Sequence, residues 1–596
     1  MTLAEPAARS DEDGSRSTPA GVERTPLRVR WLGSVAYREA WDLQQALFAG
    51  DDDHLLLLEH PAVYTLGVRA DEANVLVDPA SVGADLVRVN RGGDVTFHGP
   101  GQLVGYPVMT VPGRRGGGMA DTRRWVETVE QVLIDTLADL GLTAARFPGE
   151  PGVWLDVDGA RPRKIAAIGV RLSRGRSMHG FALNVDVDLD KFSHIVPCGI
   201  TDKGVTSLRA EGVDADMATV ADMVVTHAGR LLAPGRPVDR ADVAWRHTPD
   251  DLSAFSRGEG AGDRIVATRD RGRSAPTSSA RDGVPVHLGR RLDQAGVEGG
   301  LDLSTRKPDW MRVKLETGPE YRRLKKTASK LSLTTVCEEA GCPNIFECWN
   351  EGTATFMLLG ERCTRKCGFC LVDTRKPEVV DLAEPQRVAD AVAELGLDFA
   401  VLTMVARDDL SDGGAGIVAD TIRAIRATSP GTGVEVLISD LKGDAADLDT
   451  IIEARPDVLN HNIETVARLQ RAVRPSAGYA RSLSLLARSA QSAPGQDGSM
   501  LVKSGIIVGM GETDDEVVAT MADLAAVGIG IVTIGQYLRP TTTHLPIHRW
   551  VEPDTFEDWK RIGETDLGVP HVEASPLTRS SHHAGQAAGS AGRAAS

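Results

Sequence analysis

The chain has 596 residues, of which 42% are hydrophobic, and its formal net charge is −16. This length predicts two or more domains, and the hydrophobic content is enough to build a core in each, which excludes a chain disordered throughout. The acidic balance argues against nucleic acids and anionic membranes as general partners.

The first 26 residues contain no apolar segment of the kind a secretion signal requires, and they are predicted to be disordered. Apolar stretches elsewhere are far shorter than the roughly 20 residues that span a bilayer. We therefore expect a cytoplasmic protein with no membrane segment. Six of the seven cysteines lie between Cys337 and Cys370, which is a poor disulfide framework for a long cytosolic chain and favours reduced thiols that bind metal.

Residues 27–235 are predicted to form an α/β domain. Strand-like runs at Leu55–Leu58, Ile165–Leu172 and Phe181–Val187 alternate with a helical segment at Thr122–Leu140. The run Arg91–Pro107 is rich in glycine, so it offers backbone amides and close approach to a ligand.

Cys198 is the one cysteine of this half, in HIVPCGI, and Lys164 opens the apolar run KIAAIGVRL. A lone cytosolic cysteine is more often a small buried apolar residue than a nucleophile. However, together with EHPAVYTLG, GVWLDV and HGFALNV these segments resemble the lipoate-related acyltransferases, specifically lipoyl(octanoyl) transferase, over about residues 32–208. The nearest rival is a lipoate or biotin ligase, which activates its acid as an adenylate and has no need of the cysteine.

The resemblance implies a biotin/lipoate ligase-like α/β fold in which Cys198 is the nucleophile and Lys164 lowers the pKa of its thiol. Octanoyl-acyl carrier protein would donate the acyl group to a lysine of lipoyl domains of 2-oxoacid dehydrogenase subunits or of the glycine cleavage H protein. The implied octanoyl site consists of Arg91, Gly92, Gly93, Asp94, Val95, Thr96, Phe97, His98, Ala167, Ile168, Gly169, Gly180, Phe181 and Ala182.

Residues 236–300 are rich in Arg, Asp, Gly and Ser, lack apolar periodicity and are predicted to be a linker, part of which docks on a domain. Residues 301–585 form the second predicted domain. Its strands, expected near 355–359, 399–405, 434–438, 458–461, 504–508 and 531–537, are separated by helical stretches. This alternation predicts parallel β/α units in a partial (β/α)6 barrel of the TIM type, with the chemistry after the carboxyl ends of the strands.

Cys363, Cys367 and Cys370 follow the first of these strands in the spacing CxxxCxxC, which lets one loop wrap three thiolates around one metal centre. In a four-iron cluster, three thiolates leave one iron open to a small molecule. The spacing alone also fits an incomplete zinc site, although structural zinc takes four ligands.

A second triplet, Cys337, Cys342 and Cys348, stands just upstream, and the two together resemble lipoyl synthase, a radical S-adenosylmethionine enzyme. The resemblance runs from about Arg306 to Ala584. It implies two [4Fe-4S] clusters, one that binds S-adenosyl-L-methionine at the CxxxCxxC motif and an auxiliary one on the second triplet. A ferredoxin or flavodoxin-type protein would supply the electrons.

In that family a serine of an RSSYxA motif is the fourth ligand of the auxiliary cluster. The matching RSSHHA makes Ser581 the expected ligand, with Ser580 as the alternative, and places His582 where the motif has tyrosine. Gly413 and Gly414 resemble the cofactor-approach loop, although Asp-Gly-Gly is also ordinary turn chemistry. The two serines would otherwise be plain solvated residues near the predicted disordered tail, 586–596.

The whole sequence is thus interpreted as a fusion that transfers an octanoyl group and then inserts sulfur at carbons 6 and 8 of that chain. A protein of another class, in which the clusters only carry electrons, is the alternative for the second half.

Overall fold

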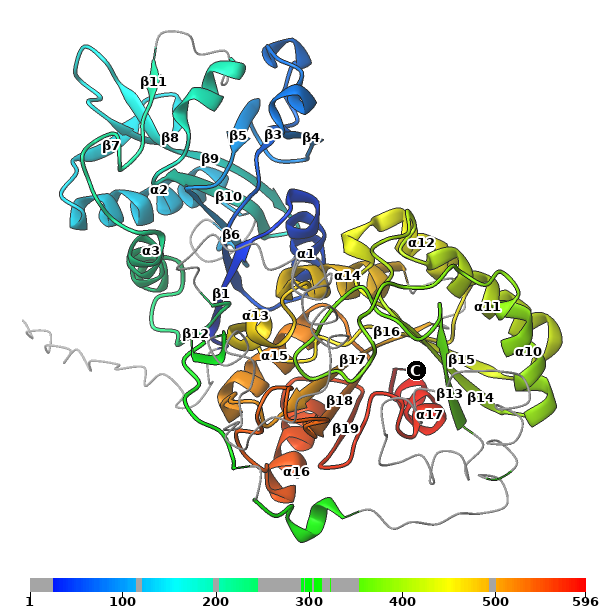
Figure 1. The fold of residues 1–596 in the computed structure, drawn as a ribbon. Coiled ribbons are helices and arrows are strands. Elements are labelled where there is room, and N and C mark those ends of the chain that lie inside the picture. The colour runs from blue at the N-terminus through cyan, green and yellow to red at the C-terminus, as the bar shows by residue number, and fades with distance from the viewer. Residues whose placement is uncertain are drawn as a thin grey trace, which may run out of the picture.

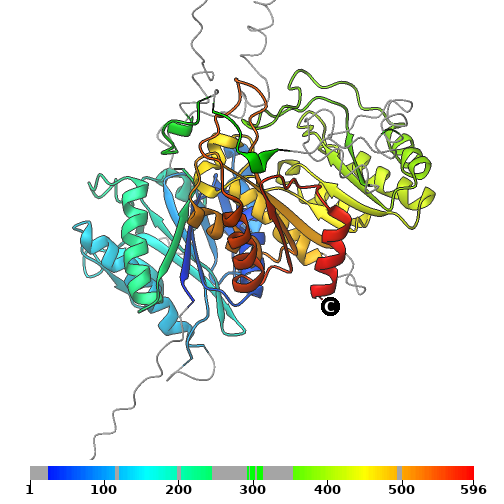
Figure 2. The ribbon, with the colours of Figure 1, turned by 90° about the horizontal axis from the view of Figure 1, so that it is seen from below.

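The computed structural model describes residues 25–113, 120–196, 203–244, 291–293, 295–302, 305–312, 322, 353–492 and 500–595. Within them the chain forms two α/β halves that lie side by side (Figures 1 and 2). Among these described residues, no helix is both long enough and apolar enough to cross a membrane.

The first half is built on a nine-stranded sheet with the order β12-β1-β2-β6-β10-β9-β8-β7, and β11 pairs with β9 at its side. A small sheet, β4-β3-β5, packs beside it. The strands are β1 (Leu27–Ser34), β2 (His54–Glu59), β3 (Val63–Leu66), β4 (Asp85–Arg88), β5 (Val95–His98), β6 (Gln102–Val108), β7 (Ala144–Phe147), β8 (Glu150–Leu155), β9 (Arg163–Ser173), β10 (Arg176–Asn184), β11 (Gly204–Val205) and β12 (Val238–Asp242).

Helices cover both faces of the large sheet. Helices α2 (Thr122–Asp139) and α3 (Met217–Leu232) pack on one face, and α1 (Tyr37–Ala49) packs on the other. The four consecutive leucines of β2 are therefore all buried, because alternate side chains of a strand point to opposite faces. Asp121 and Asp216 cap the amino ends of α2 and α3 by accepting backbone N–H bonds, which fixes where these helices begin.

The second half contains a parallel seven-stranded sheet in simple chain order, from β13 to β19. Its strands are β13 (Thr353–Leu358), β14 (Phe399–Met404), β15 (Gly433–Leu437), β16 (Val458–Asn460), β17 (Leu501–Val508), β18 (Ile531–Gln536) and β19 (His571–Ser575). Its helices are α10 (Glu384–Leu395), α11 (Ala415–Thr428), α12 (Ala445–Glu453), α13 (Gln470–Val473), α14 (Tyr479–Ser492), α15 (Asp514–Ala526), α16 (Pro553–Arg561) and α17 (Ala584–Ala595).

The predicted fold class is confirmed in both halves, with additions. β19 is a seventh parallel strand that the sequence pattern did not predict. Helix α17 occupies the segment predicted as a disordered tail, and its Ala587 and Ala591 pack against Leu501 and Ile531, the first residues of β17 and β18. This helix therefore covers the amino ends of those strands.

The region predicted as a linker also contains structure. β12 pairs in parallel with β1, so residues 238–242 belong to the first sheet. Farther on, Leu292, Ala295 and Val297 join the apolar core of the second half. Both domains therefore extend into the predicted linker, residues 236–300, and the segment between them is shorter than the composition indicates.

The two halves share one apolar cluster. Leu43 and Leu47 on α1 belong to the same buried cluster as Leu483 and Leu486 on α14, and Figure 1 shows these helices side by side. Arg30 on β1 crosses the same boundary: its Nε donates to the two carboxylate oxygens of Asp523 on α15 at 2.7 and 2.9 Å. The halves are thus packed against each other as well as joined by the chain.

Candidate functional sites

The first site is a cavity of about 560 Å³ in the first half, a size typical of small-molecule pockets. It lies where the loop before β5 (residues 91–94), β9 and β10 come together, and Lys164 is part of its wall. Of the predicted octanoyl residues, the wall contains Arg91, Gly92, Gly93, Asp94, Val95, Thr96, His98, Ala167, Ile168, Gly169, Gly180, Phe181 and Ala182. Phe97 instead points into the small sheet, where its ring packs 5.3 Å from that of Tyr64.

Arg91 holds the glycine-rich loop in place. Its guanidinium is buried and donates to the carbonyl oxygen and to Oγ1 of Thr65, both at 2.8 Å, and to the carbonyl oxygen of Gly92 at 3.1 Å. Gly93 has φ +93°, a conformation that side chains rarely adopt. Arg91 thus ties the loop to Thr65 of β3, and Arg91, Gly92 and Gly93 form part of the cavity wall.

Two strands of the wall approach so closely that only glycine fits. A Cβ atom on Gly180 in β10 would lie 2.1 Å from the carbonyl oxygen of Gly105 in β6. Gly180 thus allows β10 to pack tightly on β6, and the neighbouring side chains of Ile168 and Phe181 contribute apolar surface to the cavity.

The polar part of the cavity is a chain of hydrogen bonds. His98 pairs through Nδ1 with Oε1 of Gln102 at 2.7 Å, and the Gln102 amide donates to Asn184 at 2.9 Å. Asn184 in turn donates to the carbonyl oxygen of Thr206 at 2.8 Å. This series of hydrogen bonds therefore connects His98 to Thr206, the residue that follows β11.

Several cavity residues were not predicted. Tyr37, Tyr106 and His179 line the cavity, and His60 lies behind them, with its Nε2 2.7 Å from the hydroxyl of Tyr106. Burial lowers the pKa of His60 to about 4 and that of His179 to about 3, and it raises the pKa of Tyr37 to about 12. These groups are thus neutral near pH 7. His179 stands in the HGFALNV segment, His60 in EHPAVYTLG and Tyr106 in the run Arg91–Pro107, whereas Tyr37 lies outside every segment that the sequence singled out.

Lys164 lies in β9 with its ammonium 4.7 Å from the centre of the Trp154 ring. Its backbone is paired with Val205 in β11. Cys198 lies outside the described residues. The described residues on either side of it approach the same cavity, since Phe192 and Val205 both contribute to its wall.

The second site lies in the other half, at the loop that follows β13. Cys363, Cys367 and Cys370 are all partly buried there. The loop is tied down by backbone bonds from Cys363 to Asp373, from Thr364 to Ala406 and from Gly368 to Val473, at 2.8 to 2.9 Å. The structure thus places these three predicted ligands together at the carboxyl end of the parallel sheet.

The electrostatics of the three thiols fit a positively charged metal centre. Burial raises the pKa of Cys367 to about 12 and that of Cys370 to about 11, and for Cys367 the charge of Cys370 adds to the rise. Because desolvation and mutual repulsion oppose three adjacent thiolates, a cationic iron centre is what would stabilise them.

Arg365, inside the same loop, is held by two carboxylates that the sequence did not single out. Its guanidinium contacts Asp408 at 2.7 Å and Asp440 at 2.6 Å. Burial opposes ionisation of Asp440, but the charges of Arg365 and Arg481 hold its pKa well below the ordinary value. Asp408 and Asp440 follow β14 and β15, so neighbouring strand ends fix the cysteine loop.

Gly413 and Gly414 precede α11 and have φ values of +59° and +93°. The carboxylate of Asp412 accepts N–H bonds from Gly414 and Gly416, both at 3.0 Å. A Cβ atom on Gly414 would lie 2.3 Å from Leu359, which follows β13. The turn interpretation therefore accounts for both glycines, and a role in cofactor binding stays a prediction.

Ser581 precedes α17 and is described, whereas Cys337, Cys342 and Cys348 lie outside the described residues. The predicted auxiliary cluster can therefore be located only through Ser581. Next to it, His582 and His583 approach Glu573 on β19.

Known proteins match each half separately. Residues 36–229 match the lipoyl protein ligase A/B catalytic domain, residues 294–342 match the N-terminal domain of lipoyl synthase, and residues 357–524 match the radical SAM superfamily. A solved archaeal bipartite lipoate protein ligase from Thermoplasma acidophilum is 22% identical, with a TM-score of 0.31 over 37% of this chain and 88% of that one.

Curated relatives match the second half. The lipoyl synthase of Rubrobacter xylanophilus is 51% identical over 316 residues, which are 53% of this chain and 95% of the relative. That of Kineococcus radiotolerans is 47% identical over 298 residues, which are 50% of this chain and 87% of the relative. This chain therefore belongs to the lipoyl synthase family through its second half, and its first half adds a lipoyl protein ligase A/B catalytic domain.

Proposed function

We propose that the chain carries out two successive steps of protein lipoylation. The first half transfers octanoyl from octanoyl-acyl carrier protein to a lysine of an apo lipoyl domain, through a thioester on Cys198. The second half then inserts sulfur at carbons 6 and 8 of the bound octanoyl chain. The observation that carries the first step is the cavity in which Lys164 and thirteen of the predicted octanoyl residues meet.

The cavity suits an acyl chain and an acyl-transfer reaction. Its wall offers apolar surface from Ile168 and Phe181, hydrogen bonds from neutral groups such as Tyr37 and His179, and a cation from Lys164. The Cys198 thiolate would attack the thioester carbonyl and release the carrier thiol. The lipoyl-domain amine would then attack the acyl-enzyme, form the amide and return a proton to the sulfur.

In this scheme Lys164 favours the thiolate, because an ammonium beside a thiol lowers its pKa from the free value of about 8.5. The wall residues Ile168 and Phe181 would hold the acyl chain. Lipoyl domains of 2-oxoacid dehydrogenase subunits and the glycine cleavage H protein are the proposed acceptors.

In the second half, Cys363, Cys367 and Cys370 would hold the cluster that binds S-adenosyl-L-methionine, and Ser581 would complete the auxiliary cluster. Bound there, these groups supply the radical needed for C–H bonds that no side-chain base can deprotonate. Arg365, Asp408 and Asp440 fix the position of the cysteine loop. A ferredoxin or flavodoxin-type protein is the proposed reductant.

The substitution Cys198→Ser separates the two steps. We expect intact-mass spectrometry of the wild-type chain to detect one octanoyl group on Cys198 after mixing with octanoyl-acyl carrier protein without ATP. The variant should form neither the acyl-enzyme nor an octanoylated lipoyl domain. With its clusters assembled and supplied anaerobically with S-adenosyl-L-methionine, a reductant and a pre-octanoylated domain, the variant should still produce lipoylated domain, methionine and deoxyadenosine.

The alternatives give different results in the same assays. Modification that requires ATP and free octanoate, and that survives in Cys198→Ser, would identify a ligase instead. A second half that only carries electrons would release neither methionine nor deoxyadenosine.

A further inference from the structure

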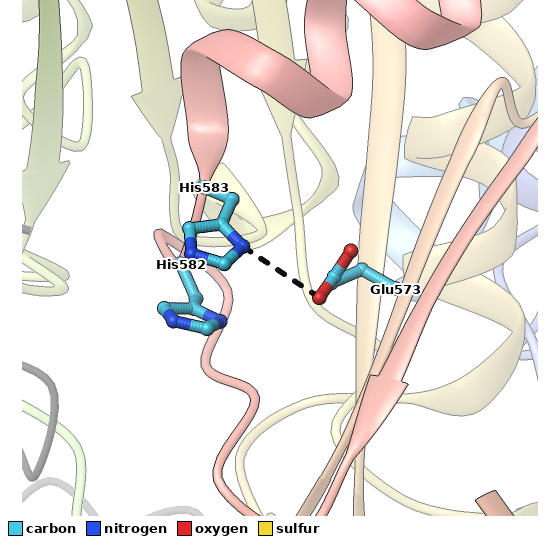
Figure 3. A group of neighbouring side chains, drawn as sticks. All are labelled: Glu573, His582 and His583. Carbon is cyan, nitrogen blue, oxygen red and sulfur yellow. Dashed lines mark ion pairs between the residues drawn. The ribbon is translucent and has the colours of Figure 1, made fainter. Parts of the chain in front are cut away.

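Glu573, His582 and His583 form a compact group of potential metal ligands outside the cysteine loop (Figure 3). Their donor atoms, one imidazole nitrogen from each histidine and one carboxylate oxygen, all lie within 4.8 Å of one another. The Nδ1 atom of His583 is 3.9 Å from Oε1 of Glu573. No other such group occurs among the described residues.

The fold brings these residues together from two segments. On β19, Val572 and Ala574 pack in the apolar core with Phe556 and Trp559 of α16. The intervening Glu573 therefore points to the opposite face of the sheet, as side chains alternate along a strand. His571 shares that face, with Nε2 3.6 Å from Oε2 of Glu573.

The histidines come from the turn before α17. His583 has φ +50°, the left-handed conformation, and the two adjacent imidazoles stack with their ring centres 3.8 Å apart. Consecutive side chains in an extended segment would point apart. The turn thus directs both imidazoles to the side where Glu573 lies, as Figure 3 shows.

The donor atoms of the group suit a cation. Glu573 supplies a carboxylate, and His582 and His583 supply imidazole nitrogens that bind a metal once they are unprotonated. His582 is 7% exposed, so a cation bound here would be largely shielded from solvent.

We propose that Glu573, His582 and His583 bind a divalent first-row transition metal ion such as zinc. Two imidazoles and one carboxylate are ligands that zinc and ferrous iron accept, and three protein ligands leave a position open. Ligands of one zinc ion lie within about 4 Å of one another, so small side-chain rotations complete the site. His571 would act as a positioning residue, because its Nε2 lies 3.6 Å from Oε2 of the carboxylate that binds the metal.

The test uses the full-length chain with its iron-sulfur clusters assembled, so that the cluster cysteines are occupied. Zinc is added anaerobically, excess is removed by dialysis, and the bound zinc is counted and studied by zinc K-edge X-ray absorption. We expect one zinc per chain with only nitrogen and oxygen neighbours, at about 2.0–2.2 Å. Zinc bound to sulfur, at about 2.3 Å, or no retained zinc would overturn the proposal.

Variants assign the site. Glu573→Gln and His583→Ala should each weaken zinc binding at least tenfold. The control His227→Ala, which removes an imidazole paired with Asp139 in the first half, should bind as the wild type does. If His583→Ala keeps the wild-type affinity, the group is a stack of imidazoles beside a carboxylate and not a metal site. The zinc count and the absorption spectrum of the wild type test the proposal without any variant, so they decide it even where a variant fails to fold.

Discussion

At the scale of single residues, the cavity of the first half contains imidazoles that are buried without a charge. His60 contacts the carbonyl oxygen of Val35 and the hydroxyl of Tyr106, both at 2.7 Å. His179 contacts Oδ1 of Asn90, also at 2.7 Å. Burial lowers the pKa of both imidazoles, so protonating either one opposes the folded state.

This burial predicts acid sensitivity of the first half. In the unfolded chain these imidazoles take up protons as the pH falls below about 6.5, whereas folded His60 stays neutral until about pH 4. The free energy of unfolding should therefore fall between pH 7 and pH 5, by about 2 kcal/mol for each imidazole.

Urea unfolding of the wild type and of His60→Gln at pH 7 and pH 5 checks this prediction. The variant should be less stable at pH 7, because it loses hydrogen bonds, but its midpoint should change less with pH. An equal pH dependence in both proteins would show that His60 is not held neutral by the fold.

At the scale of elements, the neighbouring antiparallel strands β6 and β10 approach each other closely at two glycines. A Cβ atom on Gly180 would meet the backbone of Gly105, which cannot rotate away as a flexible side chain can. Gly180→Ala should therefore push β10 from β6, cost about 1–3 kcal/mol of stability and distort the cavity.

The matched control is Gly50→Ala, at the end of α1. Gly50 has φ −87°, and a Cβ there would lie 3.7 Å from the nearest atom, an ordinary contact. Octanoyl transfer should fall sharply in Gly180→Ala and stay unchanged in Gly50→Ala. Full transfer by Gly180→Ala would mean that the cavity does not hold the acyl chain.

The elements were largely predictable because each carries its own periodic pattern. The helix expected at 122–140 corresponds to α2, and the six expected strands of the second half correspond to β13–β18. β19 was missed because His571 and Glu573 break its apolar run. The cysteine loop was found from its spacing, whereas Asp408 and Asp440 become its neighbours only when the strands are placed side by side.

At the scale of the whole molecule, the contact between the halves could not be predicted. The apolar faces of α1 and α14 look like those of any helix that covers its own sheet. Only the folded chain shows that Leu43 and Leu483 share one cluster. The apolar pattern that predicts a helix therefore does not predict whether its face packs on its own sheet or on another domain.

Arg30 is the residue at which this contact can be tested. Its side chain is 2% exposed, contacts Asp523 at 2.7 Å and Asp239 at 2.9 Å, and the Tyr479 hydroxyl donates to Asp523 at 2.9 Å. Arg30→Met should leave Asp523 buried without its guanidinium, at a cost of about 3–5 kcal/mol. Because Asp523 belongs to the other half, that cost falls on the contact between halves.

Hydrogen exchange of α1 and α14 measures the result, since both helices lie at the boundary. Arg28→Met is the matched control, because Arg28 is on the same strand but pairs at 2.5 Å with Asp52 of its own half. Exchange in both helices should rise in Arg30→Met and stay near the wild-type rate in Arg28→Met. If α14 stays equally protected in Arg30→Met, the apolar cluster alone holds the halves together, and the ion pair does not contribute to their contact.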